Sequence, residues 1–275
     1  MTEKIGFIGT GNMGTALLTG ARNAYEAERF VFYDMDPDKR DQITDKLGIG
    51  AAEDTADVAG QAKYLFLMVK PQSYEEVLTQ IRDQLREDHI LVSVAPGVTA
   101  KWIYRITGWD EKDVSERFRV VRVMPNTPAL LGAGMTGYAY GEGELTDEEN
   151  EVIRRIFASC GKACRVDESL MDAVICASGS SPAFYYLVID AIAKRCEALG
   201  MTREDAVLFS AQAAYGSAQM VLEAGEDPAV LAERVCSKGG TTIEGVRSLQ
   251  KDDLDGVMAR AVDATYARAV EMRKE

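Results

Sequence analysis

The feature that most constrains the fold is a glycine motif near the start of the chain. Gly9, Gly11 and Gly14 form G-x-G-x-x-G, directly after an apolar run at 4–8 and directly before a helical pattern. In that setting the first glycine permits a tight strand-to-helix turn, the second lets the backbone approach a pyrophosphate, and the third allows the helix to pack closely on the strand. The motif therefore predicts a dinucleotide-binding βαβ unit.

An acidic residue downstream supports the same prediction. Dinucleotide-binding units carry a carboxylate about 20 residues after the glycines, at the end of the second strand, and Asp34 follows the apolar run 30–33. A carboxylate there can accept hydrogen bonds from the adenosine ribose and would repel the 2′-phosphate of NADP, which favours NADH over NADPH. Lys39 and Arg40 follow and could meet a phosphate, or could simply solvate the next helix.

The first part of the chain alternates short apolar runs with longer helical patterns, which is typical of βαβ units on a parallel sheet. The run that begins at 64 is apolar throughout, as expected for a central strand covered on both faces. We expect strands at 4–8, 30–33, 64–69, 90–94, 119–124, 136–140 and 163–166, and helices at 12–24, 37–47, 74–85 and 147–159.

Beyond residue 166 the pattern changes to apolar residues at helical spacing. We expect a boundary there, with an α/β dinucleotide-binding domain over 1–166 and an all-helical domain over 167–275. The segment 206–222 is almost uncharged on every face, which predicts burial against a second subunit and hence a homo-oligomer. Helices are expected at 169–176, 182–199, 203–223, 229–235, 242–250 and 254–273.

Composition excludes several classes of function. With 31 basic and 44 acidic residues the net charge is −13, so nucleic acids and anionic membranes are poor partners. The single histidine, His89, leaves no room for a histidine-rich zinc site, and no metal is expected. Since His89 precedes the strand at 90–94, we expect it at the surface or in a turn, away from any ligand.

The cysteines and the start of the chain bear on localisation. The five cysteines are odd in number and contain no C-x-x-C pair, which indicates free thiols in a reducing compartment. The chain enters an apolar strand pattern directly after Met1, without a cleavable signal, and no stretch of about 18 uncharged apolar residues follows. The sequence therefore predicts a cytoplasmic protein.

Three expected strand ends carry residues that suit a ligand-binding edge, because the carboxyl ends of parallel strands face the ligand crevice. Proline and glycine are also common in ordinary turns, so turn chemistry alone is the alternative. The residues concerned are Val69, Lys70 and Pro71 after the third strand, Ala95, Pro96 and Gly97 after the fourth, and Asn126 after the fifth.

Two motifs stand out in the helical part. Ser178 and Ser180 precede Ser181 and Pro182, a pair typical of a helix break with a new N-cap; a structural and a functional role both remain open. The second motif is a glycine-threonine loop that could present its N–H groups to a small anion, typically a carboxylate. Thr241 and Glu244 of this loop match a capping box, so a merely capped helix is the alternative. The loop residues are Gly239, Gly240, Thr241 and Thr242.

Together these motifs, in this order and spacing, resemble those of the Δ1-pyrroline-5-carboxylate reductase family along nearly the whole chain. The resemblance implies a Rossmann-type domain followed by a helical dimerisation domain, and an assembly of dimers or of decamers built from dimers. It also implies reduction of 1-pyrroline-5-carboxylate to proline by NADPH or NADH. The motifs are those around Gly9, Lys70, Asn126, Ser178 and Gly239.

The same resemblance assigns roles to residues. It implies a cofactor along Gly9, Thr10, Gly11, Asn12, Met13 and Gly14, with the strand-end residues around the nicotinamide. It places the substrate carboxylate on the N–H groups of the glycine-threonine loop, contributed across the dimer, and the Thr242 hydroxyl beside the ring nitrogen. Three positions depart from the family pattern, namely Ser181, Phe184 and Lys238.

Two other functions remain possible on the sequence. A 3-hydroxyacid dehydrogenase shares this domain plan but needs a lysine early on the first interdomain helix, whereas the helix at 182–199 has only Lys194, near its far end. A non-catalytic NAD(P)-binding regulator is the second alternative. The intact glycine-threonine loop argues for retained substrate binding.

Overall fold

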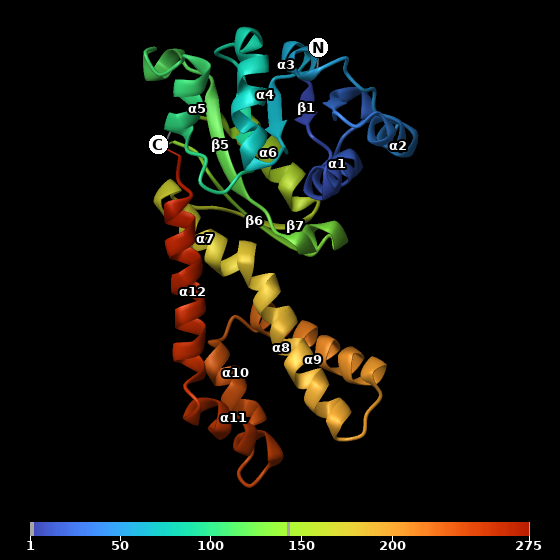
Figure 1. The fold of residues 1–275 in the computed structure, drawn as a ribbon, viewed down its shortest axis with the longest axis vertical. Helices are drawn as coiled ribbons and strands as arrows, with labels where there is room; N and C mark the ends of the chain where they lie inside the picture. The colour runs from blue at the N-terminus through green and yellow to red at the C-terminus, as the bar shows by residue number, and fades with distance from the viewer. Residues whose placement is uncertain (1–2, 142–143, 275) are drawn as a thin grey trace. The chain divides into compact units, whose positions relative to one another are not determined.

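The computed structural model describes residues 3–141 and 144–274. The chain divides into two compact units, one containing the residues up to 180 together with those from 265 onward, and the other containing 181–264 (Figure 1). The boundary near residue 166 stays a prediction of where the cofactor-binding and substrate-binding roles separate.

A seven-stranded sheet forms the first unit, with the strand order β2-β1-β3-β4-β5-β6-β7. All neighbouring strands are parallel except β5 and β6, which are antiparallel. Each expected strand is present, with ends that shift by about two residues at most. The strands are β1 Ile5–Ile8, β2 Phe30–Tyr33, β3 Tyr64–Leu67, β4 Ile90–Ser93, β5 Arg119–Met124, β6 Gly134–Ala139 and β7 Gly161–Arg165.

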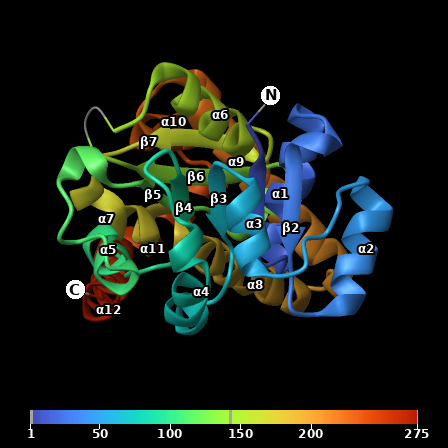
Figure 2. The ribbon, with the colours of Figure 1, turned by 90° about the horizontal axis from the view of Figure 1, so that it is seen from above.

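Helices cover both faces of the sheet (Figure 2). Leu17 of α1 and Phe157 of α6 pack in one core with Phe66 of β3, and Leu78 of α4 packs in the other core with Leu65. Neighbouring residues of β3 therefore face opposite cores, as expected for a central strand. The helices of this unit are α1 Asn12–Ala24, α2 Pro37–Leu47, α3 Thr55–Gln61, α4 Tyr74–Ile81, α5 Ala100–Thr107, α6 Asp147–Ala158 and α7 Met171–Val174.

The second unit is helical, and its α8 and α9 pack side by side (Figure 1). Ala206 and Ser210 are the buried residues of α9, whereas Phe209 is 67% exposed. By length and composition alone, the helical segment Glu168–Ala198 could cross a bilayer. A helix whose apolar face is covered by a second subunit can have the same length and composition. The helices are α8 Ser181–Ala198, α9 Arg203–Ala224, α10 Pro228–Val235, α11 Thr241–Lys251 and α12 Leu254–Glu271, whose last residues, from 265, belong to the first unit.

The expected helix break before Pro182 is absent. A π-helical turn, Ile175–Ser180, leads directly into α8, which begins at Ser181. The wider turn accommodates the serines and Gly179 without interrupting the helix, so Ser178 and Ser180 do not lie at an exposed helix N-terminus. Such π-helical turns occur often at functional sites.

The expected surface position of His89 is wrong. The residue lies in the turn before β4, at the amino end of the sheet as predicted, but its side chain is fully buried. The reason is that both ring nitrogens find backbone partners, Arg86 and Ala62, so the imidazole can be enclosed without an unpaired polar atom.

Candidate dinucleotide and substrate site

The three glycines of the G-x-G-x-x-G loop have the backbone roles that the motif predicts. Gly9 has φ +93°, a conformation that side chains disfavour. A Cβ on Gly14 would lie 2.5 Å from the carbonyl oxygen of Gly9, whereas a Cβ on Gly11 would meet no atom within 4 Å. Gly11 is the N-cap of α1 and makes no side-chain cap. Open space at the positive end of a helix fits a pyrophosphate.

Asp34, at the end of β2, is drawn inward onto this loop. It is 6% exposed, and its Oδ2 accepts hydrogen bonds from the N–H of Thr10 (2.6 Å) and from the Thr10 hydroxyl (2.8 Å). Oδ1 accepts the N–H of Asp36 at 3.1 Å. Burial alone would raise the pKa of Asp34, but these hydrogen bonds outweigh it and hold the pKa below its usual value. A carboxylate has about four acceptor sites, so one remains for a ribose hydroxyl.

Arg40 also returns to the end of β2. Its Nη1 donates to the carbonyl oxygen of Asp34 at 2.7 Å, and its guanidinium carbon lies 5.3 Å from the centre of the Tyr33 ring. Arg40 therefore does more than solvate α2, because it places a cation beside Asp34, the residue predicted to bind the ribose. The neighbouring Lys39 is exposed on α2.

The strand-end residues lie at one edge of the sheet, because β3, β4 and β5 are adjacent and parallel. Tyr74, which sequence reasoning missed, holds two of these ends together. Its hydroxyl donates to the carbonyl oxygen of Leu67 (2.9 Å) and accepts the N–H of Val94 (2.8 Å). No sequence signal distinguishes Tyr74 from an ordinary buried aromatic residue. Of the predicted residues here, Lys70 is exposed, Val69, Pro71 and Pro96 are half-buried, and Ala95 and Gly97 are buried.

Asn126 connects this edge to the serine motif. Its Nδ2 donates to the carbonyl oxygen of Ser178 at 3.1 Å, and its Oδ1 accepts the N–H of Met135 at 2.9 Å. The Ser178 hydroxyl donates to the carbonyl oxygen of Val174 at 3.0 Å. The amide of Asn126 is thus engaged within the protein, and the structure brings Ser178 next to the predicted nicotinamide edge.

The glycine-threonine loop belongs to the second unit, whereas the residues above belong to the first. Gly239 has φ +76°, and the N–H of Gly240 donates to the carbonyl oxygen of Ser237 at 3.0 Å. The expected capping box is wrong. Gly240 is the N-cap and α11 begins at Thr241, so Glu244 lies too far along the helix and pairs with Arg247 at 2.7 Å.

That loop still offers an anion a suitable surface. The N-cap of α11 makes no side-chain hydrogen bond to the first turn, and both Thr241 and Thr242 are exposed. The first N–H groups of a helix have no intrahelical partner and carry a partial positive charge. A small carboxylate fits this end of α11.

A glycine-rich loop at a helix N-terminus, on a mainly parallel sheet and followed by a helical unit, defines a dinucleotide-binding protein of the Rossmann class. Residues 168–272 match the family model described as pyrroline-5-carboxylate reductase dimerisation, and residues 4–97 match the model described as NADP oxidoreductase, coenzyme F420-dependent. The chain is 40% identical over 276 residues to the pyrroline-5-carboxylate reductase of Escherichia coli (strain K12), covering 100% of both proteins. It belongs to the pyrroline-5-carboxylate reductase family.

Solved structures give the same result. A pyrroline-5-carboxylate reductase from Coxiella burnetii superposes with a TM-score of 0.91 at 32% identity, over 100% of both chains. The Plasmodium falciparum pyrroline carboxylate reductase with NADP bound superposes with a TM-score of 0.84 at 26% identity, over 99% of both chains. The fold expected from the sequence, a Rossmann-type domain with a helical dimerisation domain, is confirmed.

Proposed function

We infer that this protein reduces the C=N bond of 1-pyrroline-5-carboxylate with NAD(P)H and forms proline, the last step of proline biosynthesis. The observation that carries this proposal is the full-length relationship to the bacterial reductases. We propose that it works in the cytoplasm, as a homodimer or as a decamer built from dimers. The five free cysteines support a reducing compartment.

For the cofactor, we propose that the loop from Gly9 to Gly14 holds the pyrophosphate and that Asp34 accepts a ribose hydroxyl. The strand-end residues and Asn126 would enclose the nicotinamide, which supplies the hydride. We favour NADH because the ionised Asp34 repels a 2′-phosphate. Arg40 is the residue that opposes this preference, since its guanidinium could attract one.

For the substrate, we propose that the N–H groups of Gly239, Gly240, Thr241 and Thr242 bind the carboxylate across the dimer, and that Ser178 and Ser180 are also substrate-binding residues. A cyclic imine protonated on nitrogen is already a strong electrophile, so the protein mainly has to hold its C=N carbon in place and exclude water. The Thr242 hydroxyl, directly or through a water, would hold the proton on the ring nitrogen. The reaction therefore needs no imidazole base.

One assay tests the reaction and separates it from the alternatives. The purified protein is mixed with 1-pyrroline-5-carboxylate and either NADH or NADPH, and the loss of nicotinamide absorbance is followed. A 3-hydroxyacid with NAD is the control for a dehydrogenase. Lys194 is paired with Asp190 at 2.6 Å, which argues against a role as the catalytic lysine of that reaction. Absence of turnover with both substrates would instead indicate a regulator. A KM for NADPH far below that for NADH would contradict the cofactor preference.

The role of Thr242 can be tested by substitution. Thr242→Ala should lower kcat by about 10- to 1000-fold, the range of one lost donor or positioning contact. Thr242→Ser keeps the hydroxyl and is the matched control, with most of the activity retained. If the alanine variant turns over at the wild-type rate, Thr242 has no part in the chemistry.

A further inference from the structure

Residues 272–274, which we call the strap, run against the loop that follows β4. Val98 and Lys274 form a parallel β-bridge. The N–H of Lys274 donates to the carbonyl oxygen of Gly97 at 2.7 Å, and the Thr99 hydroxyl donates to the carbonyl oxygen of Lys274 at 2.8 Å. The strap backbone is therefore bonded, through both the N–H and the carbonyl oxygen of Lys274, to the loop that contains the predicted nicotinamide contacts.

The side chain of Lys274 extends this connection to the loop that follows β3. Its Nζ donates to the carbonyl oxygen of Pro71 at 3.2 Å and lies 4.4 Å from the centre of the Trp102 ring on α5. A cation over an indole ring is a stabilising contact. Lys274 thus contacts both the loop after β3 and the loop after β4, although it lies far from both in the sequence.

The loop position next to the strap, Gly97, requires glycine for two reasons. A Cβ at this position would lie 2.3 Å from the carbonyl oxygen of Met272, and its φ of +75° disfavours a side chain as well. Only a glycine lets the strap approach the loop this closely. The close approach therefore depends on the glycine at position 97.

An ion pair anchors the strap from the other side. Arg273 Nε donates to Oδ2 of Asp172 at 2.7 Å, and Asp172 is 3% exposed. The charge-assisted bond to a buried carboxylate limits how far the strap can move. The strap is thus held at two adjacent residues: Arg273 binds Asp172, and Lys274 binds the loops that follow β3 and β4.

We propose that the strap positions the two loops that receive the nicotinamide, and that Lys274 is a positioning residue for hydride transfer. This rests on the proposed function, which places Lys70, Pro71 and Ala95 to Gly97 at the nicotinamide. Lys274 acts through Pro71 and Gly97. Its loss should loosen the nicotinamide end of the site and leave the adenosine end, at Gly9 to Gly14 and Asp34, unchanged.

The test uses binding, which requires no turnover. Lys274→Met removes the donor and the cation but keeps an apolar stem against Trp102. It should weaken binding of NADH and NADPH by about three- to thirtyfold, the range of one lost hydrogen bond and one cation–π contact, as measured by the emission of the bound reduced nicotinamide. Affinity for ADP-ribose, which lacks the nicotinamide, should not change. Lys274→Arg should restore most of the lost affinity.

Lys101→Met is the matched control, because Lys101 is an exposed lysine on the same helix as Trp102, and it should bind both ligands as the wild type does.

In steady state, Lys274→Met should raise the KM for the cofactor and leave the KM for the imine unchanged. Equal weakening of ADP-ribose and NAD(P)H, or no weakening of either, would overturn the proposal. If the protein bound NAD(P)H but did not reduce 1-pyrroline-5-carboxylate, the proposed reaction would fail while the binding comparison would still decide the role of the strap.

Discussion

His89 lies at the amino end of β4, where its ring connects the turn before this strand to the end of α3. Nδ1 accepts the N–H of Arg86 at 2.8 Å, so the neutral ring carries its proton on Nε2, which donates to the carbonyl oxygen of Ala62 at 2.9 Å. Burial lowers the pKa of His89 to about 4, and the positive charge of Arg86 acts in the same direction. The residue is therefore neutral in the folded protein throughout the physiological range.

This lowered pKa predicts how stability depends on pH. The unfolded chain binds a proton on His89 below about pH 6.5, whereas the folded chain does so only near pH 4. The contribution of His89 to the free energy of unfolding is therefore fully present above pH 6.5 and falls by about 2–3 kcal/mol as the pH drops toward 4. At pH 7, the free energy of unfolding of His89→Gln should be lower than that of the wild type by about 1–3 kcal/mol, so the variant unfolds at a lower urea concentration. Between pH 7 and pH 5 the variant should lose less stability than the wild type.

The kcat of His89→Gln should not change, because the amino end of β4 lies at the edge of the sheet opposite the predicted ligand-binding residues. Urea unfolding of both proteins at the two pH values, with kcat measured at pH 7, checks this. An unaltered pH dependence in the variant would show that His89 does not carry the effect, and a large loss of kcat would show that the imidazole matters to the chemistry.

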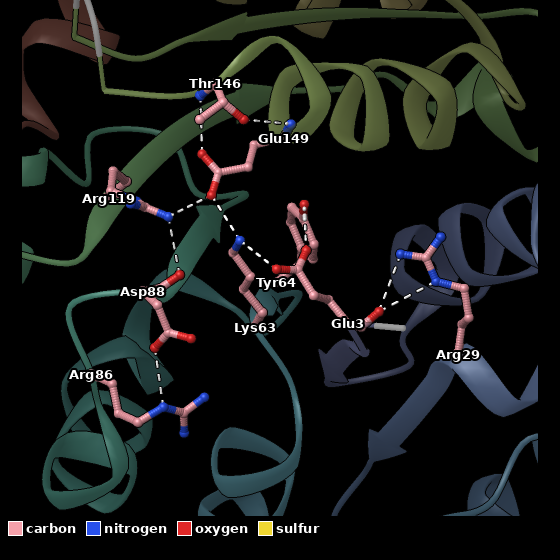
Figure 3. A network of polar contacts seen from close by, with 9 residues as sticks. All are labelled: Glu3, Arg29, Lys63, Tyr64, Arg86, Asp88, Arg119, Thr146 and Glu149. Carbon is pink, nitrogen blue, oxygen red and sulfur yellow. Dashed lines mark hydrogen bonds and ion pairs between the residues drawn. The ribbon is translucent and has the colours of Figure 1, made fainter. Parts of the chain in front are cut away.

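At the scale of elements, a polar network joins α6 to the starts of β3 and β5 (Figure 3). Glu149 Oε1 receives Lys63 Nζ and Arg119 Nη2, each at 2.8 Å, and Oε2 accepts the N–H of Thr146 at 3.0 Å. Lys63 also pairs with Glu3 at 2.6 Å. Burial alone would raise the pKa of Glu149, but the bond from Lys63 and the charge of Arg119 hold it below its usual value.

Glu149→Gln should destabilise the protein by about 1–3 kcal/mol, because it leaves two partly buried cations without their shared carboxylate. Glu151→Gln, on the same helix, is the matched control. Glu151 pairs with Arg154 at the surface, where ion pairs contribute little, so its loss should change the melting temperature far less. Calorimetry of the wild type and both variants measures the melting temperatures. Equal melting temperatures for the two variants would contradict the stabilising role of Glu149. Activity at pH 7 should be alike in all three.

The elements that sequence could predict are those with a clear apolar pattern. The strand from Tyr64 is apolar throughout, and the helices from Asn12 and Asp147 each bury one regular apolar face, so these patterns appear in the sequence. The sequence patterns did not predict α3 and α5. In α3 only Thr55, Val58 and Ala59 are buried, which are too few positions to show a period. The segment of α5 is rich in aromatic and β-branched residues, which are more typical of strands. The π-helical turn was also missed, since serine, glycine and proline together are more typical of a break.

The candidate site divides in the same way. The glycines of the nucleotide loop could be predicted because their roles depend on backbone geometry within a few residues. Asp34 could be placed, but not its inward bonds to Thr10, which depend on a contact between two loops. Asn126 could be named as a candidate, but not its bond to Ser178, and Tyr74 and Lys274 could not be named at all. These side chains act through backbone groups that are distant in the sequence, so only the folded chain shows the contacts.

At the scale of the whole molecule, the helical unit cannot satisfy its own apolar surface. On α8, Tyr185 and Leu187 are 63% and 69% exposed, and on α9 Leu208 and Phe209 are 61% and 67% exposed. Apolar surface of this extent on two packed helices marks an interface. Residues 168–272 carry the family's dimerisation domain, which supports the homo-oligomer that the uncharged segment 206–222 predicts. A second copy, and not a bilayer, is the expected cover.

Sedimentation velocity in detergent-free buffer tests this assignment. The wild type should sediment as a dimer or larger, and Phe209→Asp should shift it toward the monomer, because a buried unpaired carboxylate costs several kcal/mol at each copy of the interface. Leu131→Asp is the matched control: Leu131 is 88% exposed but lies outside the helical unit, so the assembly should persist. If the glycine-threonine loop serves the partner's cofactor across the dimer, reductase activity should fall with the dimer in Phe209→Asp and recover at high protein concentration. A monomeric wild type, or a protein soluble only in detergent, would contradict the assignment of these helices to a subunit interface.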